Sequence, residues 1–140
     1  MMELSYNKKL YKKRGISIAL HESGQMYLET IYILLLQNAK IRAIDVGTYL
    51  GYTKPSVSRA VGILKKDEYI IVDCDGYISL TPSGKEIAEK LYERHTVLSN
   101  MLMSLGIDEK TATEDACRIE HVISDKSFNV VKKHYFDFKK

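Results

Sequence analysis

The sequence has few of the residues that mark several classes of protein. Its 140 residues include only two cysteines, Cys74 and Cys117, which are too few for a disulfide scaffold and favour a reducing, cytoplasmic compartment. They include only two prolines, and 45% of them are hydrophobic and 28% charged. This composition excludes collagen-like structure and extensive disorder. It predicts a soluble globular chain with one compact domain or two small ones.

Long hydrophobic runs are also missing. The apolar run over 31–36 has only six residues, whereas a helix that crosses a bilayer needs roughly 18–20. The N-terminus is basic but has no apolar segment followed by a small-residue cleavage site. We therefore expect neither a secretory signal nor a membrane partner.

Charge is present but unevenly distributed. The net charge is only +3, yet residues 1–14 carry +4, residues 15–37 carry −2, residues 38–66 carry +5 and residues 67–140 carry −4. A basic half suits a polyanion such as nucleic acid, and an acidic half suits a cation. Chance clustering on a solvated surface is the alternative explanation.

Apolar spacing predicts a mainly α-helical chain with one small β-hairpin. Helices are expected over 23–37, 43–50, 54–66, 81–104 and 108–123, and from 124 or 125 to 138. Two β-rich runs over 69–72 and 77–80 flank an Asp-Gly turn, which is a strong hairpin signal. Gly51 suits a sharp helix end, and Thr53 can cap the next helix. We expect three parts, namely a basic arm over 1–21, a winged helix-turn-helix domain over 22–83 and a helical domain over 84–140.

Two short helices joined by a tight glycine turn and followed by a hairpin form a winged helix-turn-helix. The major groove of B-DNA is about 12 Å wide and admits one helix, whose N-terminal part lies nearest the base edges. Here that part is 53–59. We expect Arg59 to pair with guanine and Arg42, Lys65 and Lys66 to bind phosphates. The candidate DNA contacts are Arg42, Thr53, Lys54, Pro55, Ser56, Ser58, Arg59, Lys65 and Lys66. Winged helices also serve as protein-interaction modules, but the basic face favours DNA.

The helix expected over 108–123 carries a thiol, a carboxylate and an imidazole on one face. Cys117, Glu120 and His121 stand at positions i, i+3 and i+4, separate from the apolar stripe of this helix. These donor types together bind first-row divalent metals. The alternative is a structural cysteine with charged neighbours at a coincidental spacing.

Other potential ligands lie further from this cluster in the sequence. Met26 and Glu29 share a face of the first helix, beside its apolar stripe, and His95 lies on the long helix. Their ordinary roles would be a gap-filling methionine and a histidine at the edge of the core. His21 and His134 have no partner at a useful spacing, and we expect both at the surface.

The sequence resembles the DtxR/MntR family of bacterial metal-dependent transcriptional repressors, in a short form without the SH3-like domain. The resemblance rests on five stretches, in the family's order, over 26–32, 54–58, 80–84, 94–95 and 115–125. It implies a homodimer whose winged helices bind a palindromic operator when metal is loaded. It also implies that the last three helices form the dimerisation domain.

The resemblance also implies a set of metal ligands that mixes two branches of the family. The implied primary site, as in the iron-responsive branch, is Met26, Cys117, Glu120 and His121, and the implied second site, as in the manganese-responsive branch, includes Glu29 and His95. The manganese branch has Asp where Met26 stands and Glu where Cys117 stands. The iron branch's ancillary site requires an acid where Ser99 stands and a histidine where Thr113 stands.

Ligand softness decides the expected metal. A thioether and a thiolate favour Fe(II) over the oxygen-preferring Mn(II), so we expect Fe(II), with Mn(II) or another divalent transition metal as the alternative. A winged-helix regulator that responds to a small molecule is the runner-up function. An enzyme is disfavoured, because Cys117 and His121 lie inside a helix with no evident oxyanion donors.

Overall fold

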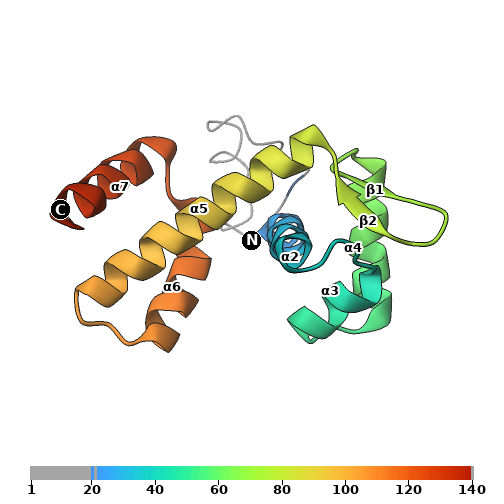
Figure 1. The fold of residues 1–140 in the computed structure, drawn as a ribbon, viewed down its shortest axis with the longest axis horizontal. Coiled ribbons are helices and arrows are strands. Elements are labelled where there is room, and N and C mark those ends of the chain that lie inside the picture. The colour runs from blue at the N-terminus through green and yellow to red at the C-terminus, as the bar shows by residue number, and fades with distance from the viewer. Residues whose placement is uncertain (1–19, 21, 140) are drawn as a thin grey trace, which may run out of the picture. The chain divides into compact units, whose positions relative to one another are not determined.

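The computed structural model describes residue 20 and residues 22–139. The basic arm expected over 1–21 and the surface position expected for His21 lie outside the described residues, apart from Leu20. Figure 1 shows the elements in chain order, and they are α2 (Glu22–Gln37), α3 (Ala43–Leu50), α4 (Lys54–Lys66), β1 (Ile70–Val72), β2 (Ile78–Leu80), α5 (Pro82–Ser104), α6 (Glu109–Val122) and α7 (Asp125–Lys139).

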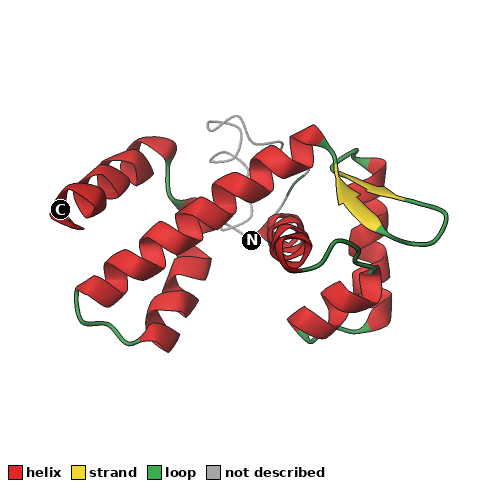
Figure 2. Cartoon of the chain, in the orientation of Figure 1, coloured by secondary structure: helices red, strands yellow, loops and turns green. Residues whose placement is uncertain are grey.

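The expected fold class is confirmed. Figure 2 shows that helices make up most of the described chain and that one antiparallel hairpin interrupts them. The two strands pair in the register Ile70↔Leu80, Ile71↔Ser79 and Val72↔Ile78. Within the described residues, no helix is both long and apolar enough to cross a membrane.

The chain divides into two compact units, each described by itself. One is Glu22–Tyr92, and the other includes Glu93–Lys140. The division falls inside α5, so this helix begins in the first unit and ends in the second. The domain boundary expected at 83–84 stands at the start of the same helix and stays a prediction.

The unit Glu22–Tyr92 has a core of apolar residues from α2, α3, α4 and the hairpin. The core residues include Leu28, Ile31, Val46, Val57, Leu64, Ile70 and Ile78. We refer to residues 70–80, the two strands and their turn, as the wing. Gly84, in the first turn of α5, packs closely against the backbone of Tyr69, the residue before the wing. A Cβ at position 84 would lie only 2.0 Å from the backbone oxygen of Tyr69.

Local signals in the sequence end and begin α3 and α4 where expected. Gly51 takes a left-handed conformation with φ of 71°, which terminates α3 at low steric cost. Thr53 then caps α4, because its hydroxyl oxygen accepts a hydrogen bond from the backbone N–H of Ser56. The two helices are thus joined by the short turn that a helix-turn-helix requires.

The unit Glu93–Lys140 is built from the second part of α5 with α6 and α7. Its core consists of Val97, Leu98, Ala116 and Phe128, with half-buried apolar residues of α6 and α7 packed against it. Asp108 caps α6 by accepting the backbone N–H of Thr111 at 3.0 Å. This bond and a second one from the Thr111 hydroxyl lower the pKa of the Asp108 carboxyl.

Candidate functional site

Arg94 on α5 fixes the end of α6. Its side chain is 2% exposed, and its guanidinium donates hydrogen bonds to the carbonyl oxygens of Glu120 at 3.1 Å and Ile123 at 2.8 Å. It also pairs with the carboxylate of Asp125 at the start of α7. Carbonyls at a helix C-terminus lack partners within the helix, so this arginine satisfies them. The sequence offered two signals for Arg94, its spacing within the apolar stripe of α5 and its place in the stretch 94–95 that resembles the family.

Glu120 lies at the centre of the cluster that α6 carries. It has no exposed surface. One carboxylate oxygen, Oε2, lies 3.0 Å from Nδ1 of His95, and the other, Oε1, lies 3.3 Å from Nε2 of His121. One carboxylate therefore faces two imidazoles, one from α5 and one from α6.

Cys117 completes a group of three ligand types. One ligand atom from each of His95, Cys117 and Glu120 lies within 4.8 Å of the other two. Two donors bound to one ion at about 2.0–2.3 Å each can be no more than about 4.6 Å apart. Small side-chain rotations would therefore close this group around a divalent ion. Cys117 is exposed while Glu120 is buried, so the group is open to solvent at its thiol.

The protonation state of His121 also suits a metal ligand. Burial, followed by the positive charge of Arg94 and that of His95, lowers its pKa from 6.5 to about 4. The ring is therefore neutral at pH 7, and neutral imidazole is the form that binds metals. The donor set thus fits a divalent transition-metal ion. The resemblance assigns His95 to a second site and Cys117 to the primary site, and the ligand atoms of both lie in one group with Glu120.

Met26 and Glu29 lie on α2, in the unit Glu22–Tyr92. Glu29 is only 6% exposed, as buried as the apolar stripe beside which it was expected. Met26 is half-buried, and its Sδ accepts a weak hydrogen bond from the hydroxyl of Tyr52 at 3.9 Å. Tyr52 stands directly before Thr53, the cap of α4. The sequence did not single out Tyr52, since its contact with α2 joins residues far apart in the chain.

All the residues expected to contact DNA are exposed. They are Arg42, Thr53, Lys54, Pro55, Ser56, Ser58, Arg59, Lys65 and Lys66. The apolar stripe of α4 faces inward instead, with Val57 and Leu64 each 2% exposed. Helix α4 therefore presents a basic, hydroxyl-rich face to solvent, as a helix that enters a DNA groove must.

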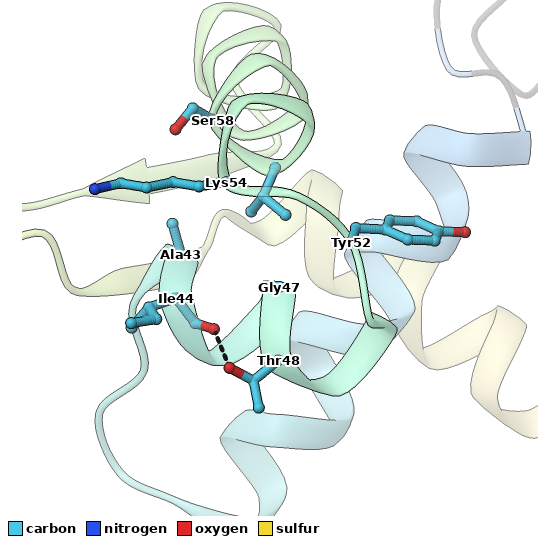
Figure 3. A pocket seen from close by; sticks show the side chains of 8 residues that line it. Ala43, Ile44, Gly47, Thr48, Tyr52, Lys54 and Ser58 are labelled. Atoms are coloured by element: carbon cyan, nitrogen blue, oxygen red, sulfur yellow. Dashed lines mark hydrogen bonds between the residues drawn. The ribbon is translucent and has the colours of Figure 1, made fainter.

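A cavity of about 330 Å³ lies between α3 and α4 (Figure 3). It is lined by Ala43, Ile44, Gly47, Thr48, Tyr52, Lys54, Val57 and Ser58. The Thr48 hydroxyl donates to the carbonyl oxygen of Ile44 at 2.9 Å, the dashed line in Figure 3. Because Lys54 and Ser58 belong to the candidate DNA contacts, this cavity is part of the same exposed face.

Comparisons with known proteins match both the DNA-binding part and the metal-binding part of the chain to one family. Residues 19–77 match the family described as the N-terminal DNA-binding domain of iron-dependent repressors, and residues 81–140 match its metal-binding and dimerisation domain. The chain therefore belongs to the iron-dependent repressor family. Members of this family are metal-dependent transcriptional regulators, not enzymes, and the resemblance to the DtxR/MntR family is confirmed.

Individual relatives show how far the similarity extends. The HTH-type transcriptional regulator MntR of Bacillus pumilus (strain SAFR-032) is 36% identical over 107 residues, 76% of this chain and 74% of that protein. MntR of Geobacillus thermodenitrificans (strain NG80-2) is 36% identical over 102 residues, 73% of this chain and 72% of that protein.

Solved structures are also similar. The manganese regulator SloR has a TM-score of 0.71 at 27% identity, covering 79% of this chain and 52% of its own. The metal-dependent transcriptional regulator MtsR has a TM-score of 0.74 at 25% identity, covering 82% of this chain and 54% of its own. This chain thus spans about half the length of these two solved structures.

Proposed function

We propose that this chain represses transcription by binding palindromic operator DNA as a homodimer when it is loaded with a divalent metal ion, and that it controls genes of metal homeostasis in the cytosol. The observation that carries the proposal is the grouping of His95, Cys117 and Glu120 in a chain whose other unit is a winged helix-turn-helix. The proposed parts are a basic arm over 1–21, a DNA-binding domain over 22–83 and a metal-binding and dimerisation domain over 84–140.

The proposed primary metal ligands come from two elements, Met26 on α2 and Cys117, Glu120 and His121 on α6. Glu29 on α2 and His95 on α5 serve a second site. A shared ligand shell would restrict how the two domains are arranged, and therefore how far apart the two α4 helices of a dimer stand. That distance must match about 34 Å per turn of DNA. Metal and DNA must then strengthen each other's binding by the same factor.

The proposed dimer surface lies on the helical domain. Several large apolar side chains of this part are exposed, and they are Leu105, Val122, Val130 and Phe136. Exposed large apolar side chains that gather in one patch are typical of a protein–protein interface. The matching of this region to a dimerisation domain supports the same proposal.

Iron is the proposed metal, because the thioether of Met26 and the thiolate of Cys117 are soft ligands that favour Fe(II) over Mn(II). Mn(II) is the second candidate, since relatives of this chain are named MntR and manganese regulator. Anaerobic equilibrium dialysis of the metal-free protein against each metal decides between them. Tighter Fe(II) binding supports the proposal, tighter Mn(II) binding replaces the metal, and two ions per chain would include Glu29 and His95 in a second site.

The regulatory function is tested by selecting bound sequences from a random pool of DNA duplexes, with and without the tighter-binding metal. We expect an enriched palindrome only when metal is present. Enrichment that is equally strong without metal would favour the winged-helix regulator that responds to a small molecule. Failure to bind any duplex under either condition would contradict the proposal.

A further inference from the structure

The segment between α2 and α3 runs beside the wing as an extended chain. The backbone N–H of Ile78 donates to the carbonyl oxygen of Ile41 at 2.8 Å, and Ile41 is 1% exposed. Arg42 has extended backbone angles, with φ of −124° and ψ of 171°. Successive side chains of an extended chain point to opposite faces. Lys40 and Arg42, which flank the buried Ile41, therefore point to one common, exposed face.

Both cations converge on a single aromatic ring. The Nζ atom of Lys40 lies 5.0 Å from the centroid of the Tyr77 ring, and the Cζ atom of Arg42 lies 4.4 Å from it. Both distances fall within the roughly 6 Å over which a ring attracts a cation. Two flexible side chains from one segment are thus held against one residue of the wing.

Hydrogen bonds within the wing turn hold the backbone of Tyr77. Its backbone N–H donates to Oδ1 of Asp73 at 2.9 Å, and its carbonyl oxygen accepts from the backbone N–H of Asp73 at 3.0 Å. The backbone that carries the ring is therefore held relative to the turn. A side chain that packs on the ring lies beside the wing turn as well.

The positive charges of Lys40 and Arg42 remain available to bind an anion. Within the described part of the chain, neither Lys40 nor Arg42 forms an ion pair. Asp45, the acid in the first turn of α3, accepts a hydrogen bond from the backbone N–H of Arg42 at 2.7 Å rather than from its guanidinium. Two like charges beside one ring create a local positive potential that a neighbouring anion would relieve.

We propose that Lys40, Arg42 and Tyr77 form a phosphate-binding platform beside the turn of the wing, which binds the DNA backbone next to the bases that α4 contacts. Lys40 supplies a point charge, Arg42 supplies a planar donor fork, and Tyr77 is a positioning residue. Its ring holds both side chains in place, which reduces the entropy lost when they bind phosphate. Of the three, only Arg42 was expected from the sequence to contact DNA. This inference rests on the proposed DNA-binding function.

The salt dependence of DNA binding tests the platform. Each phosphate contact contributes about −0.9 to the slope of log affinity against log salt concentration. For the full-length, metal-loaded protein on its selected duplex, Lys40→Ala should reduce the steepness by about 0.9 and weaken binding roughly five- to tenfold at about 0.1 M salt. A scrambled duplex should be affected equally, because phosphates carry no sequence information. Lys133→Ala on α7 removes an exposed lysine from the other unit and should change neither quantity.

The role of the ring is tested separately. Tyr77→Leu should make the slope of log affinity against log salt concentration less steep, as Lys40→Ala does. Tyr77→Phe, which keeps the ring, should behave as the wild type. An unchanged slope in Lys40→Ala, with wild-type protein still binding DNA, would overturn the platform alone. Equal loss in Tyr77→Phe and Tyr77→Leu would overturn the positioning role of the ring. Wild-type protein that binds no duplex would instead contradict the proposed function itself.

Discussion

The cluster around Glu120 and the exposed face of α4 hold their side chains in opposite ways. Glu120 has no exposed surface, and Arg94, which caps the same helix, is 2% exposed and contacts both α6 and Asp125. On α4 the candidate DNA contacts are exposed, and their polar side chains have few fixed partners, the Thr53–Ser56 pair being one. Burial strengthens each polar contact and makes its loss costly, whereas exposed charges are screened by salt. We therefore expect substitutions in the cluster to change stability and metal choice, and substitutions on the DNA face to change salt-dependent binding.

Among substitutions in the buried cluster, Arg94→Met should have the largest effect on the free energy of unfolding. The substitution removes the donors to the carbonyls of Glu120 and Ile123 and leaves these groups without the charge that satisfied them. Leaving a buried acceptor unsatisfied typically costs about 1–3 kcal/mol, and urea unfolding of the metal-free protein measures this loss. Arg118→Met is the matched control, because Arg118 is an exposed arginine on α6. Equal destabilisation by the two variants would mean that Arg94 does not hold the helix end.

The pH dependence of stability reports on the same buried cluster. His121 has a pKa of about 4 in the folded protein and about 6.5 when unfolded. Below pH 6.5 the unfolded chain therefore binds a proton that the folded chain does not. The free energy of unfolding should fall between pH 6.5 and 4, by up to about 1.4 kcal/mol per pH unit. Above pH 6.5 this group should contribute no pH dependence.

Urea unfolding of the metal-free protein at several pH values measures this contribution. His121→Asn should flatten the profile between pH 6.5 and 4, whereas His134→Asn, which replaces an exposed histidine on α7, should leave it unchanged. Flattening by the His134 variant instead would show that the buried ring is not the source of the effect.

A smaller effect is expected on metal choice. Cys117→Asp replaces a soft thiolate with a hard carboxylate in the group with His95 and Glu120, so the preference for Fe(II) over Mn(II) should fall roughly tenfold or more. Anaerobic competition dialysis measures this ratio. Cys74→Ser, at the exposed cysteine of the wing turn, is the control and should leave the ratio unchanged. An unchanged ratio in Cys117→Asp would remove the thiolate from the ligand set.

The parts of this fold that the sequence could predict are those encoded locally. Gly51 ends α3, Thr53 and Asp108 cap the helices that follow them, and an Asp-Gly pair turns the wing, because each signal acts within a few residues of the structure it sets. The shared face of Cys117 and Glu120 could be predicted in the same way, since the helical period alone places residues i and i+3 together.

What the sequence could not provide are the contacts that depend on packing between distant elements. The proximity of His95 to Cys117 requires α5 and α6 to meet at one particular rotation, which no local pattern specifies. The same is true of Lys40 and Tyr77, which meet only because Ile41 pairs with β2. The role of Arg94 was hidden because an arginine in an apolar stripe has no unique partner until the neighbouring helix end is placed.

The smallest expected effect concerns Tyr52, the residue that joins α2 to the turn before α4. Its hydroxyl donates to Sδ of Met26, a proposed metal ligand, and the next residue caps α4. Tyr52→Phe removes only this weak hydrogen bond and keeps the ring that packs edge-on against Tyr27. Stability should therefore be nearly unchanged, whereas the ratio of DNA affinities with and without metal should fall about twofold, within the range of one weak hydrogen bond. Tyr49→Phe, at an exposed tyrosine of α3, provides the matched control. Equal ratios in both variants would mean that the thioether and the turn are not coupled through this hydroxyl, and any coupling between metal and α4 would have to pass through the backbone packing of α2 instead.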